Sequence, residues 1–409
     1  MQKNQNMKYY VLNGVLFTIM INLYKPFAVK FIQRIGGNDF HIALYNALPG
    51  IIAVLTLLPG TIFVRKAKNK KKITTLFFIL SRSVLLFLAF VPALPTQIQP
   101  IVFVLAIAIR NFPEQVSVSL LQTYLGEIFS KREKTKAITL RNKYSVLVRI
   151  IVMLVAGNIL SVIAKTNEQT IRIYQVFFII AFCIGILEIL TFLKLEENQA
   201  IEYEENKFNA MLVFHEIRKN KQFMIFLACS TLFHFGWQMG WPLMAIYQIE
   251  YLGANEMWLA IINVFSLIVT FFSYGYWNKF IDKKGNTTAV VIATSGMAIN
   301  ILITAISPNL YILTILFAVT GFFTSGTITV LLDLLLEVTP EENRVLYIGV
   351  HNTVINIGLA ISPLVGHAIY KKTSIFTAFM VVMIIRLMGG ISFYIRKKLI
   401  TKNTYVNKN

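Results

Sequence analysis

Twelve apolar segments, most of them about 20 residues or longer, dominate the 409-residue sequence. A helix of about 20 apolar residues crosses the roughly 30 Å hydrocarbon core of a bilayer, where only helices and closed barrels satisfy their backbone hydrogen bonds. Because 56% of the residues are hydrophobic and only 14% are charged, we predict an all-α membrane protein with twelve transmembrane helices. The segments cover about residues 9–29, 41–64, 73–94, 98–125, 144–164, 172–193, 222–248, 257–281, 287–306, 310–336, 345–370 and 374–395.

The formal net charge of +20 reflects topology. With both termini inside, 28 of the 39 Lys and Arg residues fall on the inner side, six fall on the outer side and five lie within segments. This bias is the positive-inside pattern, so we predict that both termini are cytoplasmic. Nucleic-acid binding is not expected. The abundance of Ile, Lys and Asn favours a bacterial origin, and hence a multi-pass protein of the bacterial plasma membrane.

The longest polar stretch divides the segments into two sets of six. We predict an N-terminal six-helix bundle at 1–194, a cytoplasmic linker at 195–221 and a C-terminal six-helix bundle at 222–409. The two halves repeat weakly, because Glu127 and Asn142 recur at one common spacing as Glu337 and Asn352. Parallel repeats of this kind build many transporters.

A short polar turn, GYWNKFIDKKGN at 275–286, joins the eighth and ninth segments. Gly285 permits a tight reversal, and Asp282 is expected to accept hydrogen bonds from the amides of a helix N-terminus. With Gly275 and Lys283, the turn resembles the loop signature of the major facilitator superfamily. The resemblance implies two pseudo-symmetric six-helix bundles, secondary transport by alternating access, and a gating role for these four residues. The first-half copy at 65–72 is basic but lacks the Asp.

Arg110 and Glu114 lie four residues apart in the fourth segment and share a helix face. Arg110 also resembles the fourth-helix arginine motif of the family, although Pro113 and Glu114 replace its usual Gln and Gly. The pair is either proton-responsive or substrate-binding, or it is a structural ion pair. Because ionisable groups inside a membrane usually serve function, we predict that Glu114, assisted by Arg110, couples transport to an ion.

The seventh segment carries His234, Trp237, Gln238 and Trp241 along one helix face. The family resemblance implies that helices one, four, seven and ten line a central cavity, which makes these residues candidate substrate contacts. The alternative is packing, because the glycines at 236 and 240 form a close-approach motif. Further cavity candidates are Asn22, Arg149, Thr320 and Thr324, and Arg149 is expected to pair with Glu114 or with a substrate anion.

Three other charges lie in segments that are peripheral in this fold. For Arg82 and Arg386 we predict structural pairing, and we expect Glu188, near a segment end, to reach the interface. The motif from Gly358 to Gly366 resembles one associated with exporters, but its small residues chiefly indicate close helix packing.

The chain lacks a G-x(4)-G-K-(S/T) phosphate loop, so an ion gradient is the expected energy source. Protons are favoured because Glu114 is available as their carrier. The aromatic and uncharged cavity candidates predict efflux of a small amphipathic drug or metabolite. One alternative is uptake of a sugar, nucleoside or organic anion, and another is a non-transporting membrane sensor. Neither a nucleophile–base pair nor His or Cys spacing typical of a metal site is present, so we expect no enzyme, no cofactor and no metal. A monomer is expected.

Overall fold

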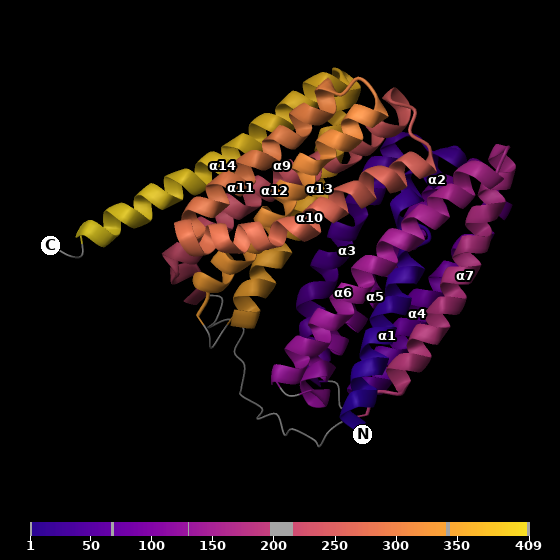
Figure 1. Cartoon of the computed structure of the whole chain (residues 1–409), viewed down its shortest axis with the longest axis horizontal. Coiled ribbons are helices and arrows are strands. Elements are labelled where there is room, and N and C mark those ends of the chain that lie inside the picture. Colours follow the sequence, from indigo (N-terminus) through magenta and orange to yellow (C-terminus); the bar gives the residue numbers. More distant parts are fainter. Residues whose placement is uncertain (1, 67–68, 130, 197–215, 341–343, 407–409) are drawn as a thin grey trace. The chain divides into compact units, whose positions relative to one another are not determined.

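The computed structural model describes residues 2–66, 69–129, 131–196, 216–340 and 344–406. Long helices account for nearly all of these residues (Figure 1). They are α1 (Gln2–Asn22), α2 (Ala28–Arg34), α3 (Asp39–Lys66), α4 (Lys70–Phe90), α5 (Gln99–Ile128), α6 (Lys131–Asn158), α7 (Asn167–Leu193), α9 (Lys221–Ile246), α10 (Glu256–Lys284), α11 (Asn286–Ile306), α12 (Leu310–Glu337), α13 (Arg344–Lys372) and α14 (Ile375–Val406).

Side-chain caps mark the start of several helices. Thr166, Asn220 and Asn309 each accept a hydrogen bond from the backbone amide three residues later, which satisfies a donor that the first helical turn leaves free. Two short π-helical segments, Ile159–Ile163 and Tyr247–Tyr251, continue α6 and α9. The all-helical prediction is therefore confirmed for the described residues.

Eleven helical segments of the described chain are long and apolar enough to cross a membrane. The seventh predicted segment corresponds to α9, which is 26 residues long but is not among the eleven. Its His, Gln and Trp residues lower its hydropathy. The first predicted segment also differs from one continuous helix, because a 3-10 turn at Lys25–Phe27 separates α1 from α2. The proline at position 26 has no amide hydrogen for α-helical bonding.

The helices form two compact units. Unit 1 contains Met1–Glu205 with Asn255–Ala260, and unit 2 contains Asn206–Ala254 with Ile261–Asn409. Most of the predicted linker, residues 197–215, lies outside the described residues, so the predicted domain limits stay a prediction. The start of α10 belongs with unit 1 because Glu256 is buried there, where it accepts hydrogen bonds from Arg34 at 2.5 and 2.9 Å and from Tyr174 at 3.3 Å.

In unit 1, α1 packs against α6 and α7, while α4 packs against α5 and α7. One core cluster joins these helices through Tyr10, Phe78, Tyr124 and Phe192. In unit 2, α9 packs against α13 and α14, and α11 packs against α12 and α14. The C-terminal end of α14 runs past the neighbouring helices of its unit (Figure 1).

Large apolar side chains also cover the outside of the helices. Phe272 is 75% exposed and Ile109 is 62% exposed. In water such a surface would drive association, whereas hydrocarbon solvates it. The outer surface therefore agrees with a protein that lies in a bilayer.

Candidate functional site

A buried charge cluster lies between α4, α5 and α7 in unit 1. Its members are Ser81, Arg82, Arg110, Glu114 and Glu188. Arg82 is 1% exposed, and its guanidinium contacts both oxygens of Glu188 at 2.8 to 3.0 Å. The same guanidinium donates to Glu114 and, at 2.9 Å, to the hydroxyl of Ser81. Two cations and two anions therefore meet away from water.

The two oxygens of Glu114 have different surroundings. Oε2 accepts hydrogen bonds from Arg82, from Ser81 at 2.7 Å and from Arg110 at 3.3 Å. Oε1 is buried and has no hydrogen-bond partner among the described residues. Since a carboxylate takes up a proton on an oxygen with a free lone pair, Oε1 is the atom at which Glu114 is free to be protonated.

Arg82 forms ion pairs with two carboxylates, Glu114 and Glu188. This arrangement determines which ion pairs would remain if Glu114 took up a proton. If Glu114 becomes neutral, Arg82 keeps its bidentate partner Glu188. Arg110 has Glu114 as its one carboxylate partner among the described residues, so it would lose that pairing. Protonation of Glu114 would therefore leave the Arg110 guanidinium without a carboxylate partner in the described part of the chain.

The cluster corrects two expectations. Glu188 was expected to reach the interface, but it is 1% exposed and bound to Arg82. Arg149 was expected as a partner of Glu114, but its side chain is exposed on α6, and within the described chain the partners of Glu114 are Ser81, Arg82 and Arg110. The reason is that α4 packs against α5 and α7, and a single sequence does not show which helices pack together.

Glycine at 185 on α7 makes room for the cluster. A Cβ atom there would lie 2.7 Å from Cγ of Arg82 and 3.2 Å from its Cδ. These separations are too short for carbon atoms, so the Arg82 side chain occupies the space that any larger residue on α7 would need.

Besides Oε1 of Glu114 and Oδ1 of Asn13, two buried polar atoms of unit 1 have no hydrogen-bond partner among the described residues. They are the hydroxyl of Tyr24 and Nε of Arg110. The Arg110 guanidinium lies 5.9 Å from the centroid of the Tyr24 ring. Asn22, the predicted cavity residue two positions earlier, instead bonds its own helix through the carbonyl of Thr18 at 2.8 Å. Sequence reasoning missed Tyr24, since a tyrosine in an apolar segment is ordinary.

An aromatic face follows α9 in unit 2. The rings of His234 and Trp237 have centroids 5.7 Å apart, and those of Trp237 and Trp241 are 6.3 Å apart. Trp241 is 39% exposed. Gln238 is buried, and its Oε1 is unpartnered among the described residues and lies close to Gly358 on α13.

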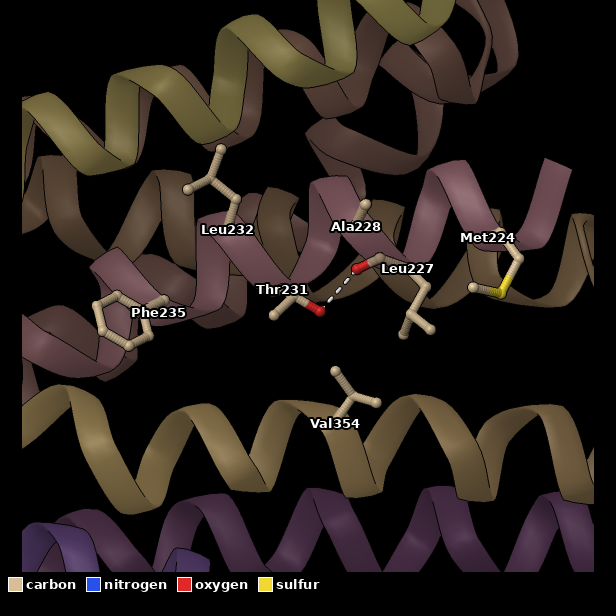
Figure 2. Close-up of a pocket in the computed structure, with 7 residues that line it drawn as sticks. All are labelled: Met224, Leu227, Ala228, Thr231, Leu232, Phe235 and Val354. Carbon is tan, nitrogen blue, oxygen red and sulfur yellow. Dashed lines mark hydrogen bonds between the residues drawn. The ribbon is translucent and has the colours of Figure 1, made fainter. Parts of the chain in front are cut away.

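An apolar groove lies between α9 and α13, with a volume of about 470 Å³ (Figure 2). Thr231 lies within this lining, but its hydroxyl bonds the Leu227 carbonyl of its own helix at 2.7 Å. The groove therefore presents an almost wholly hydrocarbon surface. Its lining residues are Met224, Leu227, Ala228, Thr231, Leu232, Phe235 and Val354.

The small residues of α9 and α13 serve packing. Arg386 on α14 is fully buried and donates to the backbone carbonyls of Gly236, Trp237 and Met297 at 3.1, 3.0 and 2.9 Å. A Cβ atom on Gly240 would lie 2.6 Å from a nitrogen of the same guanidinium. Arg386 is therefore structural, as predicted, but its partners are backbone carbonyls rather than a carboxylate.

The two predicted cavity threonines of α12, Thr320 and Thr324, differ in their surroundings. The hydroxyl of Thr320 is buried without a partner in the described part of the chain, whereas Thr324 contacts the sulfur of Met297 at 3.7 Å. Thr320 thus remains a polar group available inside unit 2.

At the predicted gating turn, Gly285 has φ +77° between α10 and α11, a conformation that glycine adopts without strain. Asp282 does not cap α11. It lies exposed in the last turn of α10, as does Lys283, and makes no hydrogen bond to another described residue. The α11 start is instead linked to α12, because Asn286 donates to Glu337 at 3.1 Å. Gly275 has no atom within 4 Å of where a Cβ would stand.

Groups of three or more His, Cys, Asp or Glu side chains suited to a metal ion do not occur among the described residues.

Comparison with known proteins identifies the fold. A family model described as Major Facilitator Superfamily matches residues 10–299 and 226–404. Curated protein sequences give no significant match.

Several solved structures share the fold over nearly the whole chain. The nucleoside transporter NupG has a TM-score of 0.73 at 15% identity, covering 97% of this chain and 99% of its own. A D-xylose–proton symporter has a TM-score of 0.70 at 14% identity, covering 96% and 98%. A bacterial homologue of the human lysosomal transporter Spinster has a TM-score of 0.67 at 13% identity, covering 97% and 96%.

Proposed function

Because this chain belongs to the Major Facilitator Superfamily, it is a multi-pass membrane transporter rather than an enzyme, and we propose that it moves a small amphipathic compound by proton-coupled alternating access. The observation that carries the proton part is the surroundings of Glu114. One of its oxygens accepts hydrogen bonds from three side chains, and the other is buried without a hydrogen-bond partner among the described residues. A buried carboxylate of this kind is a suitable proton carrier within a membrane.

The substrate part of the proposal is supported by unit 2. The rings of His234, Trp237 and Trp241 offer an aromatic face, and the neighbouring groove is lined by hydrocarbon. Pockets of this composition favour ligands with a large apolar part and few polar groups. Gln238, Thr320 and Thr324 would supply polar contacts, and export is the direction that such a substrate favours.

A second candidate is uptake of a sugar or nucleoside, and one observation favours it. The hydroxyl of Tyr24, Nε of Arg110 and Oε1 of Glu114 are buried and unpartnered within the described chain. Two donors and an acceptor of this kind would suit a hydroxylated substrate. In this case Arg110 and Glu114 would bind substrate as well as protons.

The remaining parts of the proposal concern topology and motion. Bundles at 1–194 and 222–409 would alternate about the linker at 195–221, with the turn of Gly275, Asp282, Lys283 and Gly285 as a gate. The protein would act as a monomer in a bacterial plasma membrane, with both termini in the cytoplasm. Arg149, whose charge is exposed, would attract an anionic group.

Proteoliposomes that contain a pH-sensitive dye test the coupling. Ethidium, uridine, D-xylose and benzoate would each be added to wild type, to Glu114→Gln and to Glu188→Gln. We expect ethidium to move protons in wild type and not in Glu114→Gln, because the amide cannot take up a proton. Glu188→Gln is the matched control, since it removes the same charge from the same cluster but leaves Glu114 titratable.

Each outcome decides a part of the proposal. Proton movement with uridine or D-xylose instead of ethidium would favour the second candidate. Normal coupling in Glu114→Gln would exclude Glu114 as the carrier. Absence of substrate-dependent flux with every probe, together with intact folding, would favour a non-transporting sensor.

A further inference from the structure

A hydrogen-bonded chain links two histidines that belong to different helices of unit 2. The hydroxyl of Ser230 on α9 lies 3.2 Å from Nδ1 of His234 on the same helix and 2.9 Å from Nε2 of His351 on α13. The two imidazole centroids are 6.1 Å apart. His351 is separated from Ser230 by 121 positions in the sequence, so only the fold brings these groups together.

The contacts fix where the protons lie when both rings are neutral. Nδ1 of His234 lies 2.8 Å from the carbonyl oxygen of Ser230. A carbonyl only accepts hydrogen bonds, so Nδ1 of His234 carries the proton. Its other nitrogen, Nε2, is then a free base, and it has no hydrogen-bond partner among the described residues.

The same reasoning continues through Ser230. Because the hydroxyl faces a donor at His234, it gives its own proton to Nε2 of His351, which is therefore unprotonated. Nδ1 of His351 then carries a proton and points to Oδ1 of Asn352 at 3.4 Å. The chain of donors runs in one direction, from His234 through Ser230 to His351.

We propose that His234, Ser230 and His351 form a proton-binding relay in unit 2, separate from the charge cluster of unit 1. A proton binds Nε2 of His234, the Nδ1 proton passes to the Ser230 oxygen, and the hydroxyl proton passes to Nε2 of His351. Each transfer breaks one bond to hydrogen and forms another. One positive charge has then moved from α9 to α13.

The contact of His234 with the Ser230 carbonyl favours return of the relay to its starting protonation state. After the transfer, Nδ1 of His234 is bare and faces the Ser230 carbonyl, so two lone pairs oppose each other. This repulsion favours return of a proton to Nδ1. A return from His351 reverses the relay, whereas loss of the His351 proton elsewhere, with reorientation of the His234 ring, completes a forward step.

The relay holds one proton at a time. Two imidazolium rings 6.1 Å apart would repel each other, and water does not screen them well at a buried site. Other charged groups lie on the packed helices. Arg396 and Arg386 are on α14, near Phe226 and the α9 backbone respectively, Glu337 on α12 interacts with Arg396, and Cys229 is the neighbouring titratable group on α9.

The relay joins α9 and α13, the two helices that line the apolar groove. The groove of Figure 2 lies between the two helices that carry the relay, because its lining includes Thr231 and Phe235 on α9 and Val354 on α13. A change in the spacing of α9 and α13 would therefore alter the hydrogen bond between Ser230 and His351, which joins these helices. The inference does not rest on Glu114 or on the identity of a substrate, because proton binding is measured without one.

The test uses the full chain in nanodiscs, with histidine labelled by ¹⁵N and ¹³C. The sequence has five histidines, so single His→Gln variants assign every signal. The first measurement is the tautomer in wild type near neutral pH. We expect Nδ1–H on both His234 and His351, and a signal of Nε2–H on either ring would overturn the hydrogen-bond chain.

The second measurement is the pH titration of each ring in wild type, Ser230→Ala and His351→Gln. In wild type we expect His234 and His351 to titrate over a shared pH range in two steps, as coupled groups do. In His351→Gln, His234 should follow a simple one-step curve because its coupled partner is gone. In Ser230→Ala the two rings still repel each other, but the midpoint of His234 should move because its Nδ1 loses the contact with the hydroxyl. His41 on α3 is the internal control and should not change.

A His234 curve that is unaffected by both variants would overturn the relay, since the two rings would then be independent. Ser230→Ala removes one oxygen and keeps both rings, so it is the variant most certain to fold. Loss of coupling through Glu114 in the liposome assay would leave these titrations unchanged, which keeps the two proposals distinguishable.

Discussion

A buried arginine on α4 depends on a residue without a side chain on α7. Arg82 pairs with Glu114 and Glu188, and Gly185 lies against its aliphatic stem. A buried ion pair is stabilising only with good geometry and with its remaining hydrogen bonds made. The glycine permits that geometry, because it lets the two helices approach until the guanidinium reaches both oxygens of Glu188.

We predict that Gly185→Ala lowers the free energy of unfolding by about 1 to 3 kcal/mol, the usual cost of overpacking a filled interior. The new methyl group would push on Arg82 and lengthen its contacts to Glu188. Thermal unfolding in detergent measures the change. Gly349→Ala on α13 is the matched control, since a Cβ there meets no atom within 4 Å. Equal loss in both variants would contradict the role given to Gly185.

For single residues, the sequence indicates contacts within one helix better than contacts between helices. Arg110 and Glu114 are in contact, as their spacing of four residues on one helix indicates. The contact of Arg82 with Glu188 joins positions 106 apart, and no local pattern encodes it. For the same reason His351 was missed, because its partner Ser230 is near only in the folded chain.

Helix α9 carries the aromatic face and one half of the proposed relay, and it is irregular near its end. Pro242 lies inside the helix, and a π-helical segment follows at Tyr247–Tyr251. Proline removes one backbone donor, so the carbonyl of Gln238, four residues earlier, lacks its helical partner. Irregular backbone inside a helix is frequent at sites of motion or binding.

We predict that Pro242→Ala makes α9 more stable, by up to about 3 kcal/mol, because a helical hydrogen bond to the Gln238 carbonyl becomes possible. Hydrogen–deuterium exchange should slow in residues 238–246 and stay the same in α13. Transport measured with the liposome assay should also slow. Faster exchange in this segment would show that the proline, rather than alanine, is the better residue there.

Element positions were largely predictable because hydrophobic length decides them. Each of the twelve apolar segments contains a long helix, including α9. Their ends were less predictable: α6 starts at Lys131 rather than near 144, since basic residues such as Lys134 and Arg141 are good helix formers. Asp282 was wrongly expected to cap α11, because α10 extends through Lys284 and includes it.

At the scale of the whole molecule, the exposed apolar surface and the uneven distribution of basic residues both indicate a protein that lies in a membrane. Exposed residues such as Phe272 and Ile109 are suited to hydrocarbon, and the positive-inside rule predicts that the surface with most of the 39 Lys and Arg residues is cytoplasmic. The pairing of α9 with α13 and α14 within unit 2 is set by packing, which charge bias does not report.

Cysteine labelling in intact cells tests the orientation. With the native cysteines at 183 and 229 replaced by serine, we expect a cysteine at exposed Thr373 to react with a membrane-impermeant maleimide. A cysteine at exposed Lys284 should react only after the membrane is permeabilised. The reverse pattern would place both termini outside and contradict the charge argument.

The carbonyl contacts of Arg386 have a consequence for how this protein tolerates change over generations. Because the guanidinium donates only to main-chain oxygens, its hydrogen bonds do not depend on which side chains those residues carry. A change of side chain at Trp237 or Met297 therefore leaves the hydrogen bonds of Arg386 in place, whereas a side chain at Gly236 or Gly240 would collide with Arg386 itself. The side chains along α9 can thus diverge while these main-chain hydrogen bonds stay the same.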